Sequence, residues 1–182
     1  NTPVTIDSAV IANDQAVLSA PVDDPQILYA LKVKGMRGSM PFFADNKDVT
    51  FVGDVANPQA VEIMASESQA ELDAYNDQLH EFDNQIKELY TVMQQAFLDN
   101  DSILMDSLNT AGTALMEQQD SFRDDYIKAH PESFVTHYIL DQVKQDYPIA
   151  QLKELMAGFT SESLYSKDLN DYITKQERLE VG

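Results

Sequence analysis

Apolar side chains recur with helical spacing through the middle of the chain. One series alternates steps of three and four residues over three heptads: Leu72, Tyr75, Leu79, Phe82, Ile86, Leu89 and Met93. A second series of similar length follows, with Gln118 or Gln119 in its middle: Leu104, Leu108, Ala111, Leu115, Phe122 and Tyr126. Each pattern is typical of a helix with one apolar seam. Two such helices joined by a short polar turn predict an antiparallel helical hairpin over about residues 66–130.

Polar residues and a proline mark the ends of these two helices. Ser66 and Gln69 have the spacing of a capping box at the start of the first helix. The polar segment 99–102 interrupts the pattern, and its Asp101 or Ser102 can cap the second helix. Pro131 ends the second helix, because the residue before a proline is disfavoured in the α region.

Shorter helices are expected after the hairpin. Ser133 can begin one that ends at Tyr147-Pro148. Two more are predicted over residues 149–159 and 163–179, with Gly158 as the stop between them. The carboxyl-terminal third is therefore predicted to be helical.

The first third of the chain has a different period. Over residues 26–34 the apolar side chains occupy alternate positions, which predicts a half-buried strand. Asn13 and Asp14 predict a tight turn, because both residue types tolerate positive φ. Shorter alternating patterns predict three further strands, at Val4, Ile6 and Val10, at Val49 and Phe51, and at Val61 and Ile63.

Together these patterns predict an α+β fold. Residues 1–65 form a β region with a sandwich-like antiparallel sheet, and residues 66–182 form a helical region. The helical region contains the long hairpin and two to three further helices. A change in composition places the boundary near Ser66, because glycine and proline are concentrated before it.

Charge narrows the range of partners. The net charge is −19, from 31 acidic and 12 basic residues. Phosphate groups would repel such a surface, which disfavours nucleic acid and anionic membranes. No apolar stretch approaches the roughly 18 to 20 residues that a membrane-spanning helix needs. Charge alone leaves the identity of the partner open.

The chain offers little recognisable catalytic chemistry. It has no cysteine, which excludes disulfides, thiolate nucleophiles and cysteine zinc sites. Its histidines, His80, His130 and His137, lack the i, i+4 spacing of a helical zinc site. The acidic segment 99–101 lacks the glycine and terminal glutamate of a calcium loop. With no nucleophile elbow and no phosphate-binding glycine loop, we expect no enzyme, no metal and no cofactor.

Two sets of residues are candidates for an interaction face. Leu79 and Phe82 lie on the first apolar seam, which usually means core but also suits a face kept for a partner or for dimerisation. Lys32, Lys34 and Arg37 form a small basic patch in an otherwise acidic chain. We interpret this patch mainly as charge that protects an edge strand, and as an alternative it binds an acidic partner.

Several segments resemble a bacterial domain of unknown function. Residues 5–14 are similar to its strand–turn–strand signature. Phe42-Phe43 with residues 49–54 are similar to a later strand pair, and residues 126–135 to a helix start. Residues 164–182 are similar to its closing helix. This domain precedes the thioredoxin-like domain in cell-envelope thiol–disulfide oxidoreductases of the TlpA/ResA and AhpC/TSA type.

The resemblance implies a function that the composition does not. It implies an exported, often lipid-anchored protein, and the start at Asn1 leads us to expect a removed leader or upstream segment. The catalytic cysteines of that family lie outside these residues, so the chain is expected to be a non-catalytic accessory region that positions a downstream redox domain. Asp14 and Ala16 depart from the family pattern, where Gly and Phe are usual.

Two other hypotheses remain open at this point. In the first, the chain is a stand-alone coiled-coil-type interaction protein whose hairpin assembles with a second copy or with another helix. In the second, the chain is an enzyme whose site the motifs do not reveal.

Overall fold

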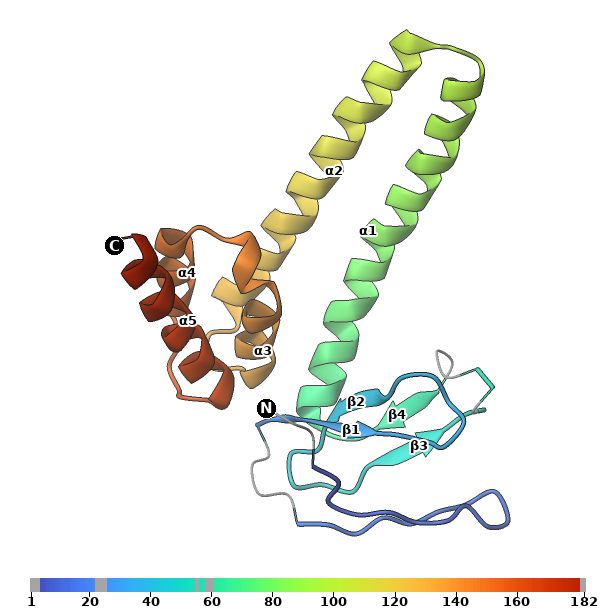
Figure 1. Cartoon of the computed structure of the whole chain (residues 1–182), viewed down its shortest axis with the longest axis vertical. Helices are drawn as coiled ribbons and strands as arrows, with labels where there is room; N and C mark the ends of the chain where they lie inside the picture. Colours follow the sequence, from blue (N-terminus) through green and yellow to red (C-terminus); the bar gives the residue numbers. More distant parts are fainter. Residues whose placement is uncertain (1–3, 22–25, 55, 58–60, 181–182) are drawn as a thin grey trace.

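The computed structural model describes residues 4–21, 26–54, 56–57 and 61–180 of the chain (Figure 1). Val181 and Gly182, which end the segment similar to a closing helix, lie outside the described residues. Small sheets come first and helices follow, which confirms the α+β class. In chain order the elements are β1 (Leu28–Leu31), β2 (Met40–Phe43), β3 (Thr50–Val52), β4 (Glu62–Met64), α1 (Glu67–Leu98), α2 (Ser102–Ala129), α3 (Phe134–Val143), the 3-10 helix η2 (Lys144–Asp146), α4 (Ile149–Met156) and α5 (Leu164–Glu180).

The strands form two separate antiparallel pairs. β1 pairs with β2, with Leu28 opposite Phe43, and β3 pairs with β4, with Thr50 opposite Met64. The two pairs meet through an edge-to-face contact between Phe42 and the ring of Phe51, whose centroids lie 5.1 Å apart. The β region is therefore antiparallel as predicted, but it is divided into two short ribbons.

The segment before the sheets is extended without forming a strand in described residues 4–21. The predicted turn at Asn13 and Asp14 is confirmed, since both have positive φ and the flanking Ala12 and Gln15 exchange two backbone hydrogen bonds of 2.8 and 3.1 Å. The strand predicted from the alternation beginning at Val4 is wrong. Alternation describes only the two faces of a strand, whereas a strand also needs a neighbour for its backbone groups.

The long helices begin where their caps were expected. The Ser66 hydroxyl accepts a hydrogen bond from the Gln69 backbone N–H at 3.1 Å, and the Asp101 carboxylate accepts one from the Leu104 N–H at 3.0 Å. The Gln69 side chain does not complete a capping box. Its Oε1 instead accepts a hydrogen bond from the Phe43 N–H at 2.9 Å, which ties α1 to β2.

The seam between α1 and α2 differs in part from the predicted one. Every predicted seam residue of α1 is buried or half-buried. In α2, Ala111 is exposed, and the neighbouring Gly112 faces Leu89, because a Cβ on Gly112 would lie 3.6 Å from the Leu89 Cδ2 atom. Leu104 is also exposed. The buried or half-buried face of α2 is Met105, Leu108, Gly112, Leu115, Gln119, Phe122 and Tyr126.

The hydrophobic core lies at the base of the hairpin, where α3, α4 and α5 pack against it. β2 contributes Phe43, which is fully buried and meets Tyr138 of α3 edge to face with ring centroids 5.8 Å apart. Helical residues complete the cluster: Leu72, Tyr75, Ile127, Val135, Ile139, Leu140, Leu152, Leu155, Leu169 and Ile173.

A carboxylate joins the base of the hairpin to α3. Glu71 of α1 accepts hydrogen bonds from the Tyr126 hydroxyl of α2 at 3.2 Å and from the Ser133 hydroxyl, the N-cap of α3, at 2.8 Å. Burial and the charge of Glu71 both raise the pKa of Tyr126. Three helices are therefore held together at one end of the arm.

A second carboxylate fixes α2 to the α4 region. Asp124 accepts hydrogen bonds from the Tyr147 hydroxyl at 2.6 Å and from the Gln151 side-chain amide at 2.8 Å. The remaining length of α1 and α2 projects from the body as an arm (Figure 1). At about 1.5 Å per residue, α1 alone is close to 50 Å long.

Candidate functional site

The arm ends in a tight turn between α1 and α2. Asn100 adopts positive φ, at 55°, and the Asp101 backbone N–H donates to the Ala96 carbonyl at 3.0 Å. Ala96 is buried beneath this turn, and the Gln95 side chain donates to the Asp99 carboxylate at 3.0 Å. The tip thus has a defined backbone with polar caps at both helix ends.

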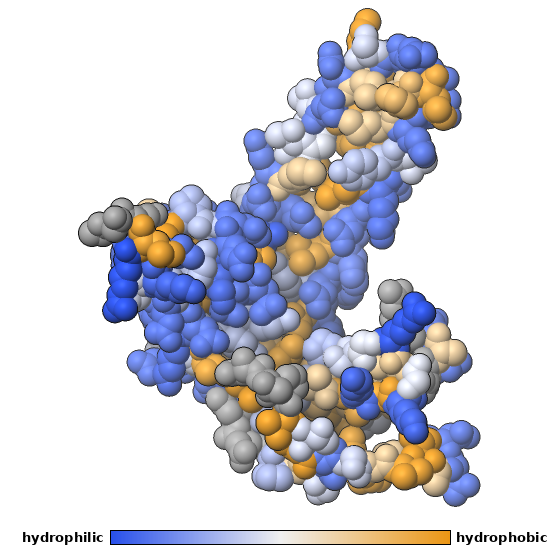
Figure 2. Space-filling model, in the orientation of Figure 1, coloured by the Kyte–Doolittle hydropathy of each residue, from blue (hydrophilic) through white to orange (hydrophobic). Residues whose placement is uncertain are grey.

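Large apolar side chains are exposed around this turn. Phe97 is 69% exposed, Leu98 66% and Ile103 83%. Figure 2 shows apolar residues gathered at the end of the arm, beyond a largely hydrophilic shaft. We call Phe97, Leu98 and Ile103 the tip residues. Covering apolar surface with a partner would recover about 25 cal/mol for each Å² removed from water.

A shallow apolar groove runs along α1 beside the tip residues. Tyr90, Met93 and Phe97 line it from one face of α1, because they are spaced by three and four residues, and Met105 of α2 contributes to it. Thr91 and Gln94 are its polar lining residues. Two flexible methionines give this groove an adaptable surface.

The distal half of the arm carries only negative charge. Between Lys87 and Arg123 the sequence contains no lysine, arginine or histidine. The same stretch contains six acidic residues: Glu88, Asp99, Asp101, Asp106, Glu117 and Asp120. Arg123 pairs with Asp120 at 3.1 Å, and Lys87 lies one turn before the groove residues Tyr90 and Thr91. The stretch between these two bases still leaves the distal arm with a net negative charge.

A second candidate lies in the interior, where His137 of α3 meets Ser163. The His137 Nδ1 atom lies 2.9 Å from the Ser163 Oγ atom, and the two residues are 0% and 2% exposed. The imidazole stacks on Phe159 with ring centroids 3.9 Å apart. Burial lowers the pKa of His137, an effect that the Pro131 backbone partly opposes. This contact holds a base next to a hydroxyl, as nucleophilic catalysis requires.

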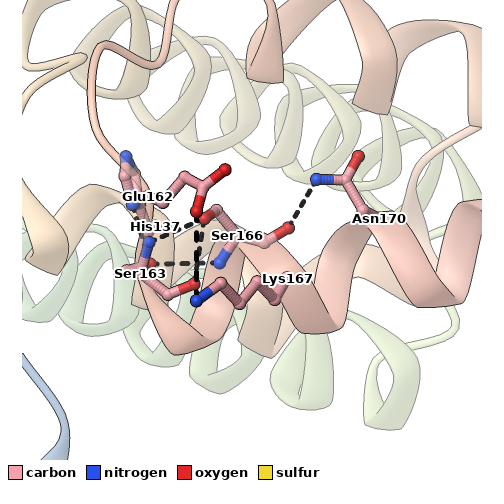
Figure 3. Close-up of polar contacts among 6 residues, drawn as sticks. All are labelled: His137, Glu162, Ser163, Ser166, Lys167 and Asn170. Carbon is pink, nitrogen blue, oxygen red and sulfur yellow. Dashed lines mark hydrogen bonds and ion pairs between the residues drawn. The ribbon is translucent and has the colours of Figure 1, made fainter.

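The hydrogen bonds around Ser163 indicate a structural role for its hydroxyl. Its Oγ accepts a hydrogen bond from the Ser166 N–H at 3.1 Å, and the Ser166 hydroxyl in turn accepts one from the Ser163 N–H at 2.8 Å (Figure 3). This reciprocal pair caps the start of α5. Lys167 and Glu162 lie at the edge of the same turn, 3.9 Å apart.

The His137–Ser163 pair lacks what acyl transfer needs. A catalytic histidine is normally oriented by a third group, but His137 Nε2 makes no hydrogen bond of normal geometry among the described residues. Burial also leaves the hydroxyl out of reach of a substrate. No cluster of three potential metal ligands occurs in the described ranges. We therefore assign this pair to the packing of α3 against α5.

The predicted interaction residues of the seam lie inside the hairpin. Leu79 is half-buried and packs against the core, and Phe82 contacts Phe122 of α2 with ring centroids 5.8 Å apart. The structure thus gives both residues a partner within the chain. A further role in binding another molecule stays a prediction.

The predicted basic residues lie at the far end of β1. Lys32 and Lys34 are exposed just after this strand, and Arg37 is exposed in the turn between Gly35 and Gly38, where both glycines have positive φ. Arg37 also lines a shallow groove beside Val61 and Ile63. Their role in binding an acidic partner likewise stays a prediction.

Sequence reasoning missed the tip residues. Phe97, Leu98 and Ile103 lie outside the heptad positions, and pattern analysis favours positions that repeat. The sequence does contain one indication of them, because large apolar residues lie immediately before and after the polar turn at 99–102.

Comparison with known proteins finds a matching family model for the first part of the chain. Residues 1–72 match the family model of a domain of unknown function (DUF4369). The match covers the extended amino-terminal segment, both strand pairs and the start of α1. No curated protein matches the chain significantly, and no solved structure does so. None of the described helices combines the length and apolarity that crossing a bilayer requires.

Proposed function

We propose that this chain is a non-catalytic accessory module that engages a protein partner through the end of its helical arm. The observation that carries this proposal is the position of the tip residues. Phe97, Leu98 and Ile103 are the exposed apolar residues furthest along the arm from a core that holds the arm at its base. Apolar surface gathered at one exposed place is typical of protein interaction sites.

The shape of the molecule supports a positioning role. Glu71 accepts a hydrogen bond from the N-cap of α3, and Asp124 accepts two from Tyr147 and Gln151 at the start of α4, so three hydrogen bonds fix the orientation of the arm relative to these helices. A rigid helical pair then holds the tip at a set distance from the body. The arm is suited to recognition at a distance rather than to enclosing a substrate.

In the narrower form of the proposal, the chain is the accessory region of a cell-envelope thioredoxin-like thiol–disulfide oxidoreductase. The support is the similarity of residues 5–14, 49–54 and 126–135 to the domain that precedes such redox domains. The match of residues 1–72 to a domain of unknown function is compatible with this proposal. The redox cysteines and any lipid anchor would then lie outside these residues.

A photo-crosslinking experiment tests the accessory role. A benzoylphenylalanine is placed at Ile103 of the intact protein in its native cells, and at the exposed Asp168 of α5 as a matched control. We expect a protein adduct from position 103 and none from position 168. Equal adducts from both positions, or none from position 103, would contradict the proposal.

The complete reading frame tests the narrower form. An Ala-Pro-x-Phe stretch and a Cys-x-x-Cys motif after Gly182 would support the oxidoreductase context. A stop codon with no redox domain would contradict it and favour the alternative of a stand-alone interaction protein. Sedimentation at several concentrations then shows whether that protein assembles with itself.

A further inference from the structure

The tip surface combines two features that together specify a kind of partner. One is the groove of Tyr90, Met93, Phe97 and Met105, whose α1 residues repeat along one helix face. The other is the run of carboxylates over residues 88–120, without a basic residue among them. An apolar groove of this form suits the apolar face of a helix, and the negative charge of the distal arm suits a helix that also carries basic side chains.

We propose that the hairpin tip is a docking site for a basic amphipathic helix of a partner protein. This inference rests on the proposed function and specifies the partner that the arm engages. The apolar face of the partner helix covers Phe97 and the groove. The negative charge of the distal arm, carried by carboxylates over residues 88–120, attracts lysine or arginine side chains of that helix.

Charge argues against a second copy of this chain as the occupant. Two tips packed against each other would bring their carboxylates together, and like charges placed face to face oppose association. The distal arm offers no basic residue between Lys87 and Arg123 to offset that repulsion. A basic segment gains from the same field, which also accelerates its approach.

A defined peptide serves as the probe. It is a fluorescein-labelled 18-residue peptide of leucine and lysine, ordered so that leucine occupies one helix face. A scrambled peptide of the same composition has the same charge but no apolar face. Binding of both peptides to the full chain is measured by fluorescence anisotropy at several salt concentrations. We expect the ordered peptide to bind at least about tenfold more tightly than the scrambled one.

Substitutions of exposed apolar residues locate the site. Phe97→Ser is expected to weaken binding of the ordered peptide about tenfold, which is a usual loss for a central aromatic contact. The control is Val10→Ser, because Val10 is 87% exposed and lies in the extended segment before the sheets. Circular dichroism verifies that both variants keep the helical content of the parent.

Substitutions of acidic residues test the charge argument. The double variant Glu88→Gln with Asp106→Asn is expected to weaken binding about fivefold and to reduce its salt dependence. Asp168→Asn with Asp171→Asn removes the same charge from exposed positions of α5 and is expected to change binding less than twofold. The comparison separates local pairing from the attraction of a chain with a net charge of −19.

Four outcomes would overturn the inference. The first is equal binding of the ordered and scrambled peptides. The second is equal weakening by the two double variants. The third is self-association in sedimentation that Phe97→Ser abolishes, which would make a second copy the occupant. A crosslink from Ile103 to a protein without a basic amphipathic segment would also overturn it, while leaving the proposed accessory role intact.

Discussion

The Nδ1 atom of His137 lies 2.9 Å from the Ser163 Oγ atom, and this contact joins α3 to the residue that caps α5. The ring is fully buried, stacks on Phe159 and meets Phe134 edge to face. A buried imidazole in apolar surroundings favours its neutral form. The pair therefore makes the stability of the helical core sensitive to pH.

Acidification is expected to weaken the fold through His137. Burial lowers the pKa of His137, whereas the unfolded chain titrates near the ordinary value of about 6.5. The unfolded state therefore binds more protons as the pH falls below that value. The stabilising contribution of neutral His137 is present above about pH 6.5 and is lost as the pH falls toward the lower folded-state pKa.

The measurement is the free energy of urea unfolding between pH 7.5 and pH 5. His137→Gln is compared with His80→Gln, in which an exposed histidine is replaced. The difference between the pH profiles of the two variants isolates the buried imidazole from the many carboxylates. Parallel profiles would contradict the expected role of His137.

The seam position of Gly112 offers a stabilising substitution. A Cβ at Gly112 would make ordinary van der Waals contact with Leu89, at 3.6 Å from its Cδ2 atom. Alanine also favours the helical backbone over glycine by about 1 kcal/mol. Gly112→Ala is therefore expected to raise the free energy of unfolding by about 1 kcal/mol. Ala111→Gly, at the exposed neighbour, should lower it by a similar amount. A destabilised Gly112→Ala would show that the helices approach more closely than described.

Ser66 joins the β region to the hairpin. Its hydroxyl caps α1 by accepting from the Gln69 N–H and donates to the Phe43 carbonyl at 2.9 Å. Ser66→Ala removes both hydrogen bonds at a buried position, so we expect a loss of about 2 kcal/mol in the free energy of unfolding. Asp101→Ala, which removes an exposed cap of α2, should cost about 1 kcal/mol. An equal cost for both would mean that the bond to Phe43 contributes little.

Two phenylalanines of α1 are expected to differ in their effect on stability. Phe82 is half-buried against Phe122, whereas Phe97 is 69% exposed. Phe82→Ala should lower the free energy of unfolding by about 2 kcal/mol, because it leaves a gap in the seam. Phe97→Ala should change it by less than about 0.5 kcal/mol. Chemical denaturation of both variants provides the comparison. A large cost at Phe97 would indicate that the tip contributes to folding.

The parts of the fold that could be predicted from sequence are those set by local chemistry. The helices follow from the spacing of Leu72 through Met93, and their starts follow from Ser66, Asp101 and Ser133, which cap through their own side chains. These features need only residues near each other in the chain. The turn at Asn13 is of the same kind.

The misassigned parts depend on residues distant in sequence. Ala111 looks more like a seam residue than Gly112, and only the presence of Leu89 opposite shows otherwise. The alternation at Val4 and Ile6 was insufficient because a strand needs a partner. The His137–Ser163 contact spans 26 residues and connects two helices, so no spacing rule could reveal it.

The hydrogen bonds of Glu71 and Asp124 hold the arm only at its base, so the arm is expected to fluctuate more toward its tip. The helical turns nearest Asn100 can open without disturbing the core, so their amide protons should exchange with solvent fastest and those around Ile127 slowest. Deuterium uptake would then report whether a partner occupies the tip, without a fluorescent label on either molecule. A docked helix would slow amide exchange around residues 97–103 and leave the exchange rates at the base of the arm unchanged.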